Sequence, residues 1–423
     1  MNNKCSRQPA DPAIPLPDGW RWVRLGEASE INPRRSDIIR QDMEPTSFVP
    51  MEAVDAEMGV ISEIRERPFA DVKKGYTYFE NGDVLFAKIT PCMQNGKHAI
   101  ARSLLEGIGF ASTEFHVIRP AKVILADWIH YFVRQPTVLH DATNHFTGAV
   151  GQQRVPDDFL KSLEIPLPPI EEQRRIAGVL REQMAAVGKA RTAAQARLEA
   201  VKALPAAFLR QVFPQPGHPL PGGWRWVKLG EVSSTISKGT TPTTLGLQYT
   251  DAGIPFLRAE DVSGWAIKVD KVAFHISNDA DETLSRSRLL PGDFLITIAG
   301  TLGRVGYVPP EVPHLNCNQA VAFARLDQSM VDTQYLCFVC RLEHVIAPLL
   351  DQKAGGALQN LKLQQIRYLD IPLPPLPEQR RIAAVLREQM ATVEKARAAA
   401  QEELATINAL PAALLRRAFN GEL

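Results

Sequence analysis

The chain has 423 residues, 45% of them apolar, and a formal net charge of +1. This length predicts two to four domains with ordinary cores, and the near-neutral charge excludes a uniformly basic surface, so any nucleic-acid surface would be a local patch. No run of about 18 apolar residues predicts a membrane span, and the polar N-terminus lacks the apolar core of a signal peptide. Five scattered cysteines do not make a disulfide framework, so we expect a reducing, cytoplasmic location.

One unit is repeated in tandem along the chain. Residues 16–27 and 220–231 both follow the pattern Leu-Pro-x-Gly-Trp-Arg-Trp-Val-x-Leu-Gly-Glu. The period of about 205 residues is far longer than the 20 to 50 residues of a solenoid repeat, which indicates a duplicated domain. The alternating tryptophans predict a short strand after a Pro-Gly turn, and we expect both tryptophans of each copy to lie in a core.

The first copy, residues 1–165, is expected to be a domain that mixes short strands with a few helices. Residues 82–88 follow an Asn-Gly turn and have strand character, as do residues 115–118. The apolar residues of 126–133 recur at helical spacing. A glycine-rich loop, 147–154, lies near the end of the domain.

The second copy, residues 214–370, repeats this order with different residues. Residues 291–298 and 321–324 are the matching strands, 335–340 the matching helix and 353–360 the matching loop. A shared order of elements with divergent content is typical of two variants of one recognition module.

A long helix follows each copy, in segments 166–213 and 371–423. Residues 172–184 recur almost verbatim as 378–390, each after an Ile-Pro-Leu-Pro-Pro lead. In each helix a row of mostly apolar or small residues recurs at alternating spacings of three and four positions. We call this row the seam, and its spacing predicts a coiled coil. The seam positions are Ala177, Leu180, Met184, Val187, Arg191, Ala194, Leu198 and Val201, and then Ala383, Leu386, Met390, Val393, Arg397, Ala400, Leu404 and Ile407. The predicted fold class is therefore α+β, with two similar mixed α/β domains in tandem joined by two long helices.

Two features interrupt the helical pattern. Arg191 and Arg397 occupy equivalent seam positions, where they either snorkel to the edge of a small-residue seam or fix its register, as a polar core residue can. Pro205 and Pro411 predict a break near the end of each helix. A second short helix is expected to follow each proline, which is tolerated in a first turn.

The sequence shows no catalytic signature. It contains no G-x-x-x-x-G-K-[ST] phosphate-binding loop, no G-x-G-x-x-G and no G-x-S-x-G. Cys337 and Cys340 form a lone C-x-x-C pair inside an apolar run, with no second pair at zinc spacing, so we expect both to be buried and structural. These absences favour a binding protein over an enzyme.

The polar loops are the candidate binding surfaces. Residues 237–244 are dense in hydroxyl groups and carry one lysine, which suits contacts with phosphates or base edges but is equally typical of a plain turn. Residues 301–304 follow a strand and end in an arginine that can reach a phosphate or a guanine edge, and 88–97 is the counterpart in the first copy. The candidate DNA contacts are Lys88, Lys97, Arg154, Lys238, Thr240, Thr241, Thr301 and Arg304.

With these motifs, the chain resembles the specificity (S) subunit of a Type I DNA restriction–modification system over nearly its whole length. The most specific parts are the proline leads with Glu-Gln-Arg-Arg-Ile, the paired Trp-Arg-Trp-Val openings and the ending 419–423. Residues 238–242, 253–261 and 292–304 are also similar to typical family segments. The first copy departs from the pattern, because Ile-Thr-Pro-Cys at 89–92 replaces the usual Gly-Thr-x-Gly turn.

The resemblance implies a specific function. Residues 1–165 and 214–370 would be target recognition domains, each reading one half of a bipartite, asymmetric double-stranded DNA target. The helices of 166–213 and 371–423 would pair as an antiparallel coiled coil that sets the spacer. Modification (methyltransferase) subunits would methylate adenines, and restriction (endonuclease/translocase) subunits would translocate and cleave. The methyl donor and ATP would bind those partners, while this chain would hold no cofactor and no metal and would catalyse nothing.

The start of each long helix, next to its proline lead, is the expected surface for partner subunits. The residues concerned are Gln173, Arg174, Arg175, Gln379, Arg380 and Arg381. Two other classes of protein remain open. One is a non-catalytic protein-interaction adaptor that oligomerises through the coiled coil, and the other is a stand-alone nuclease or methyltransferase with unrecognised motifs.

Overall fold

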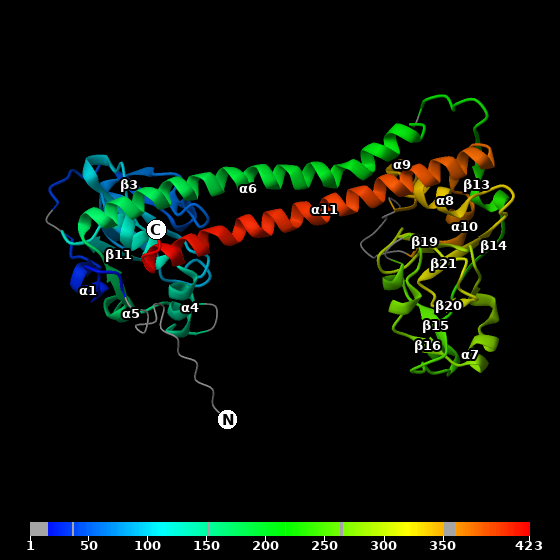
Figure 1. The fold of residues 1–423 in the computed structure, drawn as a ribbon, viewed down its shortest axis with the longest axis horizontal. Helices are drawn as coiled ribbons and strands as arrows, with labels where there is room; N and C mark the ends of the chain where they lie inside the picture. Colours follow the sequence, from blue (N-terminus) through cyan, green and yellow to red (C-terminus); the bar gives the residue numbers. More distant parts are fainter. Residues whose placement is uncertain (1–15, 36–37, 150–151, 216, 263–264, 351–359) are drawn as a thin grey trace. The chain divides into compact units, whose positions relative to one another are not determined.

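The computed structural model describes residues 16–35, 38–149, 152–215, 217–262, 265–350 and 360–423. The chain divides into two compact units, Met1–Ala196 with Gln401–Leu423, and Arg197–Ala400. Each unit combines one α+β domain with parts of two long helices, labelled in Figure 1 as α6 (Ile170–Val212) and α11 (Leu376–Phe419). In the described part of the chain, every helix is too short or too polar to span a lipid bilayer. The units cut both long helices, so the four sequence segments that end at 165, 213, 370 and 423 stay a prediction.

The domain of unit 1 is built on two four-stranded sheets. The first has the order β2-β11-β8-β9 and is antiparallel throughout. The second has the order β6-β3-β10-β7 and contains one parallel pair, β3 and β10. Two ribbons, β1 with β12 and β4 with β5, complete the domain. The strands are β1 Arg21–Arg24, β2 Ser29–Ile31, β3 Pro45–Val49, β4 Val54–Asp55, β5 Val60–Ile61, β6 Arg65–Pro68, β7 Thr77–Glu80, β8 Val84–Ala87, β9 His98–Ile100, β10 Ile108–Ala111, β11 Phe115–Pro120 and β12 Glu164–Leu167.

The helices of this domain pack one sheet against the start of α6. The helix α3 places Trp128, Ile129 and Phe132 in one core with β8 and β11, because these apolar residues share a helical face. The indole Nε1 of Trp128 donates to the carbonyl of Pro166 at 2.9 Å, which ties α3 to β12. The α-helices are α1 Leu25–Ala28, α2 Phe69–Val72, α3 Ala126–Val133, α4 Pro136–Asn144 and α5 Asp157–Ser162, with short 3₁₀ turns η1 Met51–Ala53 and η2 Leu105–Gly107.

The domain of unit 2 has the same plan. Its first sheet is β14-β21-β18-β19, its second is β16-β15-β20-β17, and β13 pairs with β22 as a ribbon. Tyr335 of α8 takes the place of Trp128, and its hydroxyl donates to the carbonyl of Pro372 at 2.6 Å. The strands are β13 Arg225–Lys228, β14 Ser233–Lys238, β15 Ile254–Leu257, β16 His275–Ile276, β17 Arg288–Leu289, β18 Phe294–Thr297, β19 Val305–Tyr307, β20 Leu315–Cys317, β21 Val321–Leu326 and β22 Asp370–Leu373. The helices are α7 Asn278–Thr283, α8 Thr333–Val339, α9 Glu343–Leu350 and α10 Leu363–Arg367, with 3₁₀ turns η3 Leu229–Val232, η4 Pro242–Leu245, η5 Ala259–Asp261, η6 Val269–Lys271 and η7 Ser285–Ser287.

The main predicted elements of both copies are confirmed. The strands predicted at 82–88, 115–118, 291–298 and 321–324 are β8, β11, β18 and β21, and the two predicted helices are α3 and α8. The glycine-rich loop 353–360 lies outside the described residues except for its last residue, and residues 150–151 of the loop 147–154 also lie outside.

The tryptophan prediction was half right. The openings do form the strands β1 and β13, and Trp20 and Trp224 pack on Trp128 and Tyr335 respectively. Trp226, however, is 47% exposed, so the second tryptophan of that copy is not a core residue. Trp224 precedes β13, whereas Trp226 lies within it beside the buried Val227. Because successive residues of a strand point to opposite faces, Trp226 points away from the core.

The predicted proline breaks are wrong. The helix α6 runs without interruption over Ile170–Val212 and α11 over Leu376–Phe419, with Pro205 and Pro411 inside them. Figure 1 draws each as one continuous helix. A proline removes one backbone hydrogen bond, but Leu209 beyond Pro205 is buried in the core of unit 2, and this packing holds the last turns helical.

The predicted seam is confirmed by its burial. Every seam position is buried or half-buried except Arg397, while most residues between them are exposed. Within unit 1 the two helices run antiparallel, because Arg175 near the start of α6 donates to the carbonyl of Leu423, which follows α11, and Met184 and Leu415 line one cavity. In unit 2, Leu209 and Leu386 share one core.

The two seam arginines differ. Arg191 is largely buried and forms an ion pair with Glu57 of the unit 1 domain. Arg397 is exposed and pairs with Glu394 of its own helix at 2.6 Å. Arg191 therefore joins the helix to the domain, while Arg397 is a solvated helix residue.

Candidate nucleic-acid interface

In unit 2, the candidate residues leave the first sheet at one end. Lys238, the last residue of β14, is paired with Ala322, and Thr297, the last residue of β18, is paired with Val321. Both strands therefore end at the start of β21. Lys238 thus stands at the start of one of the two loops that begin there, and Thr240, Thr241, Thr301 and Arg304 belong to these loops.

The turn between β18 and β19 is held by Thr297. Its hydroxyl accepts from the backbone N–H of Arg304 at 2.9 Å and donates to the carbonyl of Thr301. The N–H of Gly303 also donates to the Thr297 carbonyl at 2.9 Å. These bonds fix the turn internally and leave the side chains of Thr301 and Arg304 exposed. A fixed turn that presents a hydroxyl and a guanidinium suits base or phosphate contacts.

The loop after β14 depends on a glycine. A Cβ added at Gly239 would lie 2.0 Å from the carbonyl oxygen of Cys317, so no other residue fits there. The N–H of Thr240 donates to that same carbonyl at 3.1 Å, and the Thr241 carbonyl accepts from the Thr244 hydroxyl at 2.6 Å. Lys238 is exposed beside this anchored backbone, and the hydroxyl-bearing Thr240 and Thr241 are half-buried.

In unit 1, two of the three candidate cations are bound to other residues of the chain. Lys88 follows the last residue of β8 and is half-buried. The Nζ of Lys97 donates to the carbonyl of Met51 at 3.0 Å. Arg154 forms a two-point contact with the carboxylate of Glu114, at 2.8 and 2.7 Å, and this guanidinium lowers the pKa of Glu114 below its usual range. The same end of the sheet thus presents a different surface in each unit.

Asn32 also lies at this end of the sheet, although it was not among the candidate DNA contacts. It follows β2 with a positive φ of 53°, and its Oδ1 accepts from the N–H of Val117 at 3.0 Å. Its amide also lies 3.0 Å from Nδ1 of His116, whose other nitrogen contacts the carbonyl of Val155 at 2.8 Å. An asparagine before a proline at a strand end is the one local signal for such a turn.

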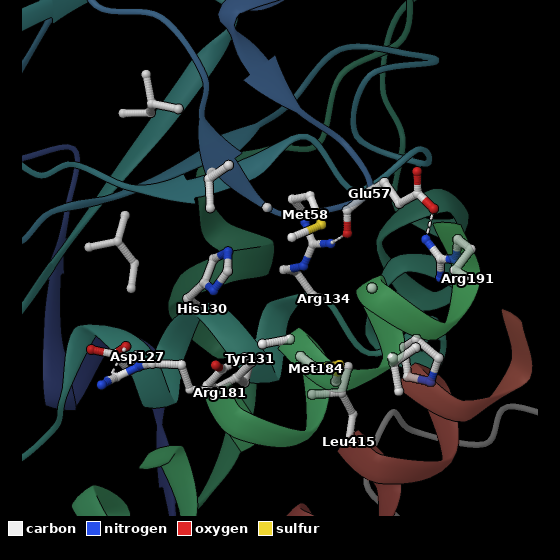
Figure 2. A pocket seen from close by; sticks show the side chains of 18 of the residues that line it. Glu57, Met58, Asp127, His130, Tyr131, Arg134, Arg181, Met184, Arg191 and Leu415 are labelled. Atoms are coloured by element: carbon white, nitrogen blue, oxygen red, sulfur yellow. Dashed lines mark hydrogen bonds and ion pairs between the residues drawn. The ribbon is translucent and has the colours of Figure 1, made fainter. Parts of the chain in front are cut away.

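A cavity of about 920 Å³ lies elsewhere in unit 1 (Figure 2). It is enclosed by α3, the β4–β5 ribbon and the paired parts of α6 and α11. Its charged side chains are paired within the lining: Asp127 accepts from Arg102 and Arg181 at 2.9 and 3.2 Å, and Glu57 pairs with Arg191. Because Arg134 also lines the cavity and is bound only to backbone carbonyls, the arginines outnumber the carboxylates.

The glutamines expected to contact partners are instead buried. Oε1 of Gln173 accepts from the N–H of Leu125, and its Nε2 donates to the carbonyls of Val123 and Pro168, all at 2.9 Å. Gln379 makes the matching bonds with Asp332, Met330 and Pro374, also at 2.9 Å. Both side chains are fully buried, so these amides join each long helix to its own domain and leave no atom for another subunit.

The four arginines of the same motifs lie on the surface. Arg174 pairs with Glu171 at 2.6 Å, Arg175 with Glu172 at 2.7 Å and Arg381 with Glu378 at 2.7 Å, each one helical turn back. Arg380 is exposed and has no ion pair with any residue that the structure describes. Exposed pairs of this kind contribute little to stability, roughly 0 to 1 kcal/mol, so these side chains remain available to a partner.

The buried cysteines fit the structural role expected of them. Cys337 and Cys340 are almost inaccessible in the core of unit 2, and burial raises the pKa of Cys340 to about 12 and that of Cys337 as well. Within the described ranges, no three histidine, cysteine or carboxylate side chains gather in a way that could hold a metal ion.

The fold contains two variants of one α+β domain, each joined to a long helix and each with loops at the same end of its first sheet. These features define a class of protein. A family model described as "Type I restriction modification DNA specificity domain" matches residues 17–190 and again 221–403. The chain therefore belongs to this family.

Individual relatives agree with this assignment. The "Type I restriction enzyme EcoAI specificity subunit" of Escherichia coli is 41% identical over 162 residues, which are 38% of this chain and 27% of that protein. The match thus spans about a quarter of the relative's length. A crystal structure described as "HsdS subunit from Thermoanaerobacter tengcongensis" has 27% identity and a TM-score of 0.63, with 96% of this chain and 98% of that chain covered.

A second solved chain is similar along its whole length. It comes from a structure described as "Structural basis underlying complex assembly and conformational transition of the type I R-M system". The TM-score is 0.76 and the identity 27%, with 97% of this chain and all of that chain covered. The tandem arrangement predicted from the sequence is therefore shared with solved members of this class.

Proposed function

We propose that the chain is the DNA-reading subunit of a Type I restriction–modification complex and that each of its two domains reads one half of a bipartite target. The observation that carries this proposal is the repeated sheet end. In a family described by its DNA specificity domain, both units present loops at the same end of an equivalent sheet. Loops on a rigid scaffold are where recognition residues usually lie.

The difference between the two ends supports an asymmetric target. Unit 2 presents exposed Lys238 and Arg304, whereas Lys97 and Arg154 of unit 1 are bound to Met51 and Glu114. A free guanidinium can bind a guanine edge or a phosphate, while an arginine already held by a carboxylate must exchange that partner first. The two half-targets therefore differ in sequence.

Catalysis belongs to partner subunits in this proposal. Modification subunits bind the methyl donor and methylate adenines, and restriction subunits bind ATP, translocate and cleave. This chain binds no cofactor, acts in the cytoplasm and meets its partners through Arg174, Arg175, Arg380 and Arg381. The exposed position of these arginines near the starts of α6 and α11 supports that contact.

The test is selection of a DNA target by the complex. The full chain is purified with its modification subunits and incubated with a library of random duplexes at several salt concentrations. We expect enrichment of one sequence with two fixed halves and an unspecified spacer, with affinity that falls as salt rises. No enrichment, together with assembly of the chain into oligomers or onto other proteins, would favour the adaptor. Methyl transfer by the isolated chain would show that it is itself an enzyme.

A further inference from the structure

The helices α3 and α8 are followed by equivalent arginines. Gln173 accepts from the N–H of Leu125, just before α3, and Gln379 accepts from that of Asp332, just before α8. Counting forward from these matched bonds places Arg134 and Arg341 at the same position. Each arginine is also near a glycine of the adjacent turn. Arg134 donates to the carbonyl of Gly96, the residue before Lys97, and Arg341 lines one cavity with Gly303, the residue before Arg304.

In unit 1 this arginine is turned inward, as Figure 2 shows. Its guanidinium donates to the carbonyls of Gly96, Ala56 and Glu57 at 2.6, 3.0 and 2.8 Å. Burial lowers the pKa of Arg134 below its usual range, although an arginine stays charged. The bonds join the turn after β8 to the β4–β5 ribbon. The role of Arg134 is therefore to hold the backbone.

In unit 2 the equivalent arginine stacks on an aromatic ring instead. The guanidinium carbon of Arg341 lies 3.2 Å from the ring centre of Trp265, which in turn packs on Phe338 at 4.1 Å. With respect to the residues that the structure describes, the side chain of Arg341 makes no hydrogen bond and no ion pair. The carboxylate of Glu394 acts on it from a distance, but that group is paired with Arg397. The indole thus orients a charged group whose side-chain N–H donors are not used by any described residue.

Arg341 and Arg304 face one cavity of about 440 Å³. The described lining is completed by Gly303, Val262, Val305, Cys340 and Ile346, and none of these carries a negative charge. Two guanidinium groups with no carboxylate between them repel each other. An anion in this cavity would relieve that repulsion.

We propose that Arg341, held on Trp265, forms with Arg304 a phosphate-binding site for the DNA backbone of the half-target that unit 2 reads. This inference rests on the proposed function. A guanidinium binds two phosphate oxygens in a planar, two-point geometry. Since the site adjoins the turn that carries Thr301, a bound phosphate fixes the register of that turn on the duplex. Unit 1 lacks the site, because Arg134 is bound to carbonyl groups.

The test compares the complex containing Arg341→Ala with the wild-type complex on the selected duplex. Loss of one phosphate contact lowers the slope of log affinity against log salt by about one. We expect about 10-fold weaker binding near physiological salt, with the same preferred bases in both halves. Arg341→Lys keeps a charge and should retain part of the slope. Trp265→Leu should weaken binding several-fold with little change in slope, because the charge remains but is no longer oriented. Arg286→Ala, an exposed arginine of the same unit, is the matched control.

Four outcomes would overturn the site. Unchanged affinity and slope in an Arg341→Ala complex that still selects its target would remove the phosphate contact while leaving the proposed function intact. A change in the preferred bases would mean that Arg341 reads a base edge. Binding of inorganic phosphate to the free wild-type complex but not to Arg341→Ala, with equal DNA affinity, would indicate a site for a free anion. If no variant or wild-type complex selects DNA, both the site and the proposed function fail.

Discussion

The repeated glutamines Gln173 and Gln379 show how one buried side chain can join two elements. Each amide satisfies three backbone groups that surround the junction between a domain and its long helix. Buried backbone donors and acceptors left without partners are costly, which explains why the same residue type stands in both copies.

Removing one of these amides should loosen one junction. We expect Gln379→Ala to lower the free energy of unfolding of unit 2 by about 3 kcal/mol, since several buried groups lose a partner. Thermal or denaturant unfolding measures this change. The adjacent exposed residue supplies the control, and Arg380→Ala should leave stability within about 0.5 kcal/mol. Equal stability of both variants would show that the amide has no structural role.

Buried histidines give unit 1 a pH dependence. His130 is enclosed near Arg134, and burial lowers its pKa to about 4, while the pKa values of His98 and His116 are also lowered, chiefly by burial. The unfolded chain binds a proton near pH 6.5. Between pH 6.5 and about 4, the unfolded state therefore holds protons that the folded state lacks.

The stability of unit 1 should consequently be complete above pH 6.5 and should fall as the pH drops toward 4. Each such histidine contributes a slope of up to about 1.4 kcal/mol per pH unit. His130→Gln keeps a donor for the carbonyl of His98, which lies 3.0 Å from Nε2, and should make the slope shallower by one proton. The exposed His145→Gln is the control. Denaturant unfolding at a series of pH values measures the slope, and an unchanged slope in His130→Gln contradicts the assignment.

Among the helices and strands, the sequence patterns correctly predicted elements whose formation depends mainly on residues nearby in the sequence. The apolar alternation of β8 and the helical spacing of α3 need only a nearby core, and both are present. The proline prediction failed because packing of Leu209 beyond Pro205 outweighs one lost hydrogen bond.

The candidate site was predictable only in part, for the same reason. The loops were identified by composition, and the structure brings those of unit 2 to one sheet end. The clash that requires Gly239, the carbonyl partners of Arg134 and the stacking of Arg341 on Trp265 involve residues far apart in the sequence. No local signal distinguishes such an arginine from a solvated one.

The paired helices should act as a ruler. We expect the antiparallel pairing of unit 1 to continue along both helices, which would match residues 192–198 with residues 400–406. Deleting both heptads preserves the seam and shortens each helix by roughly 10 Å, or about three base pairs at 3.4 Å each. We expect selection experiments to return the same two half-targets with a shorter spacer. Deleting residues 192–198 alone should abolish the bipartite selection, because it mismatches the two seams. An altered half-target after the paired deletion would contradict the ruler.

At the scale of the whole molecule, the chain is a duplication whose copies have kept their framework and changed their surfaces. Each unit retains its ribbon, its two sheets and its glutamine junction. At this end of the sheet, Lys97 and Arg154 of unit 1 are bound to other residues of the chain, whereas Lys238 and Arg304 of unit 2 are exposed. With a net charge of +1, the chain depends on partner subunits for much of the attraction to DNA in our proposal.

The central claim is that each domain independently reads one half of the target. Its most direct test replaces residues 20–160 with the first domain of another family member and maps methylated sites in cells that carry the modification subunits. We predict a new sequence in one half of the target, with the other half and the spacer unchanged. A change in both halves, or in neither half while methylation persists, would contradict the account.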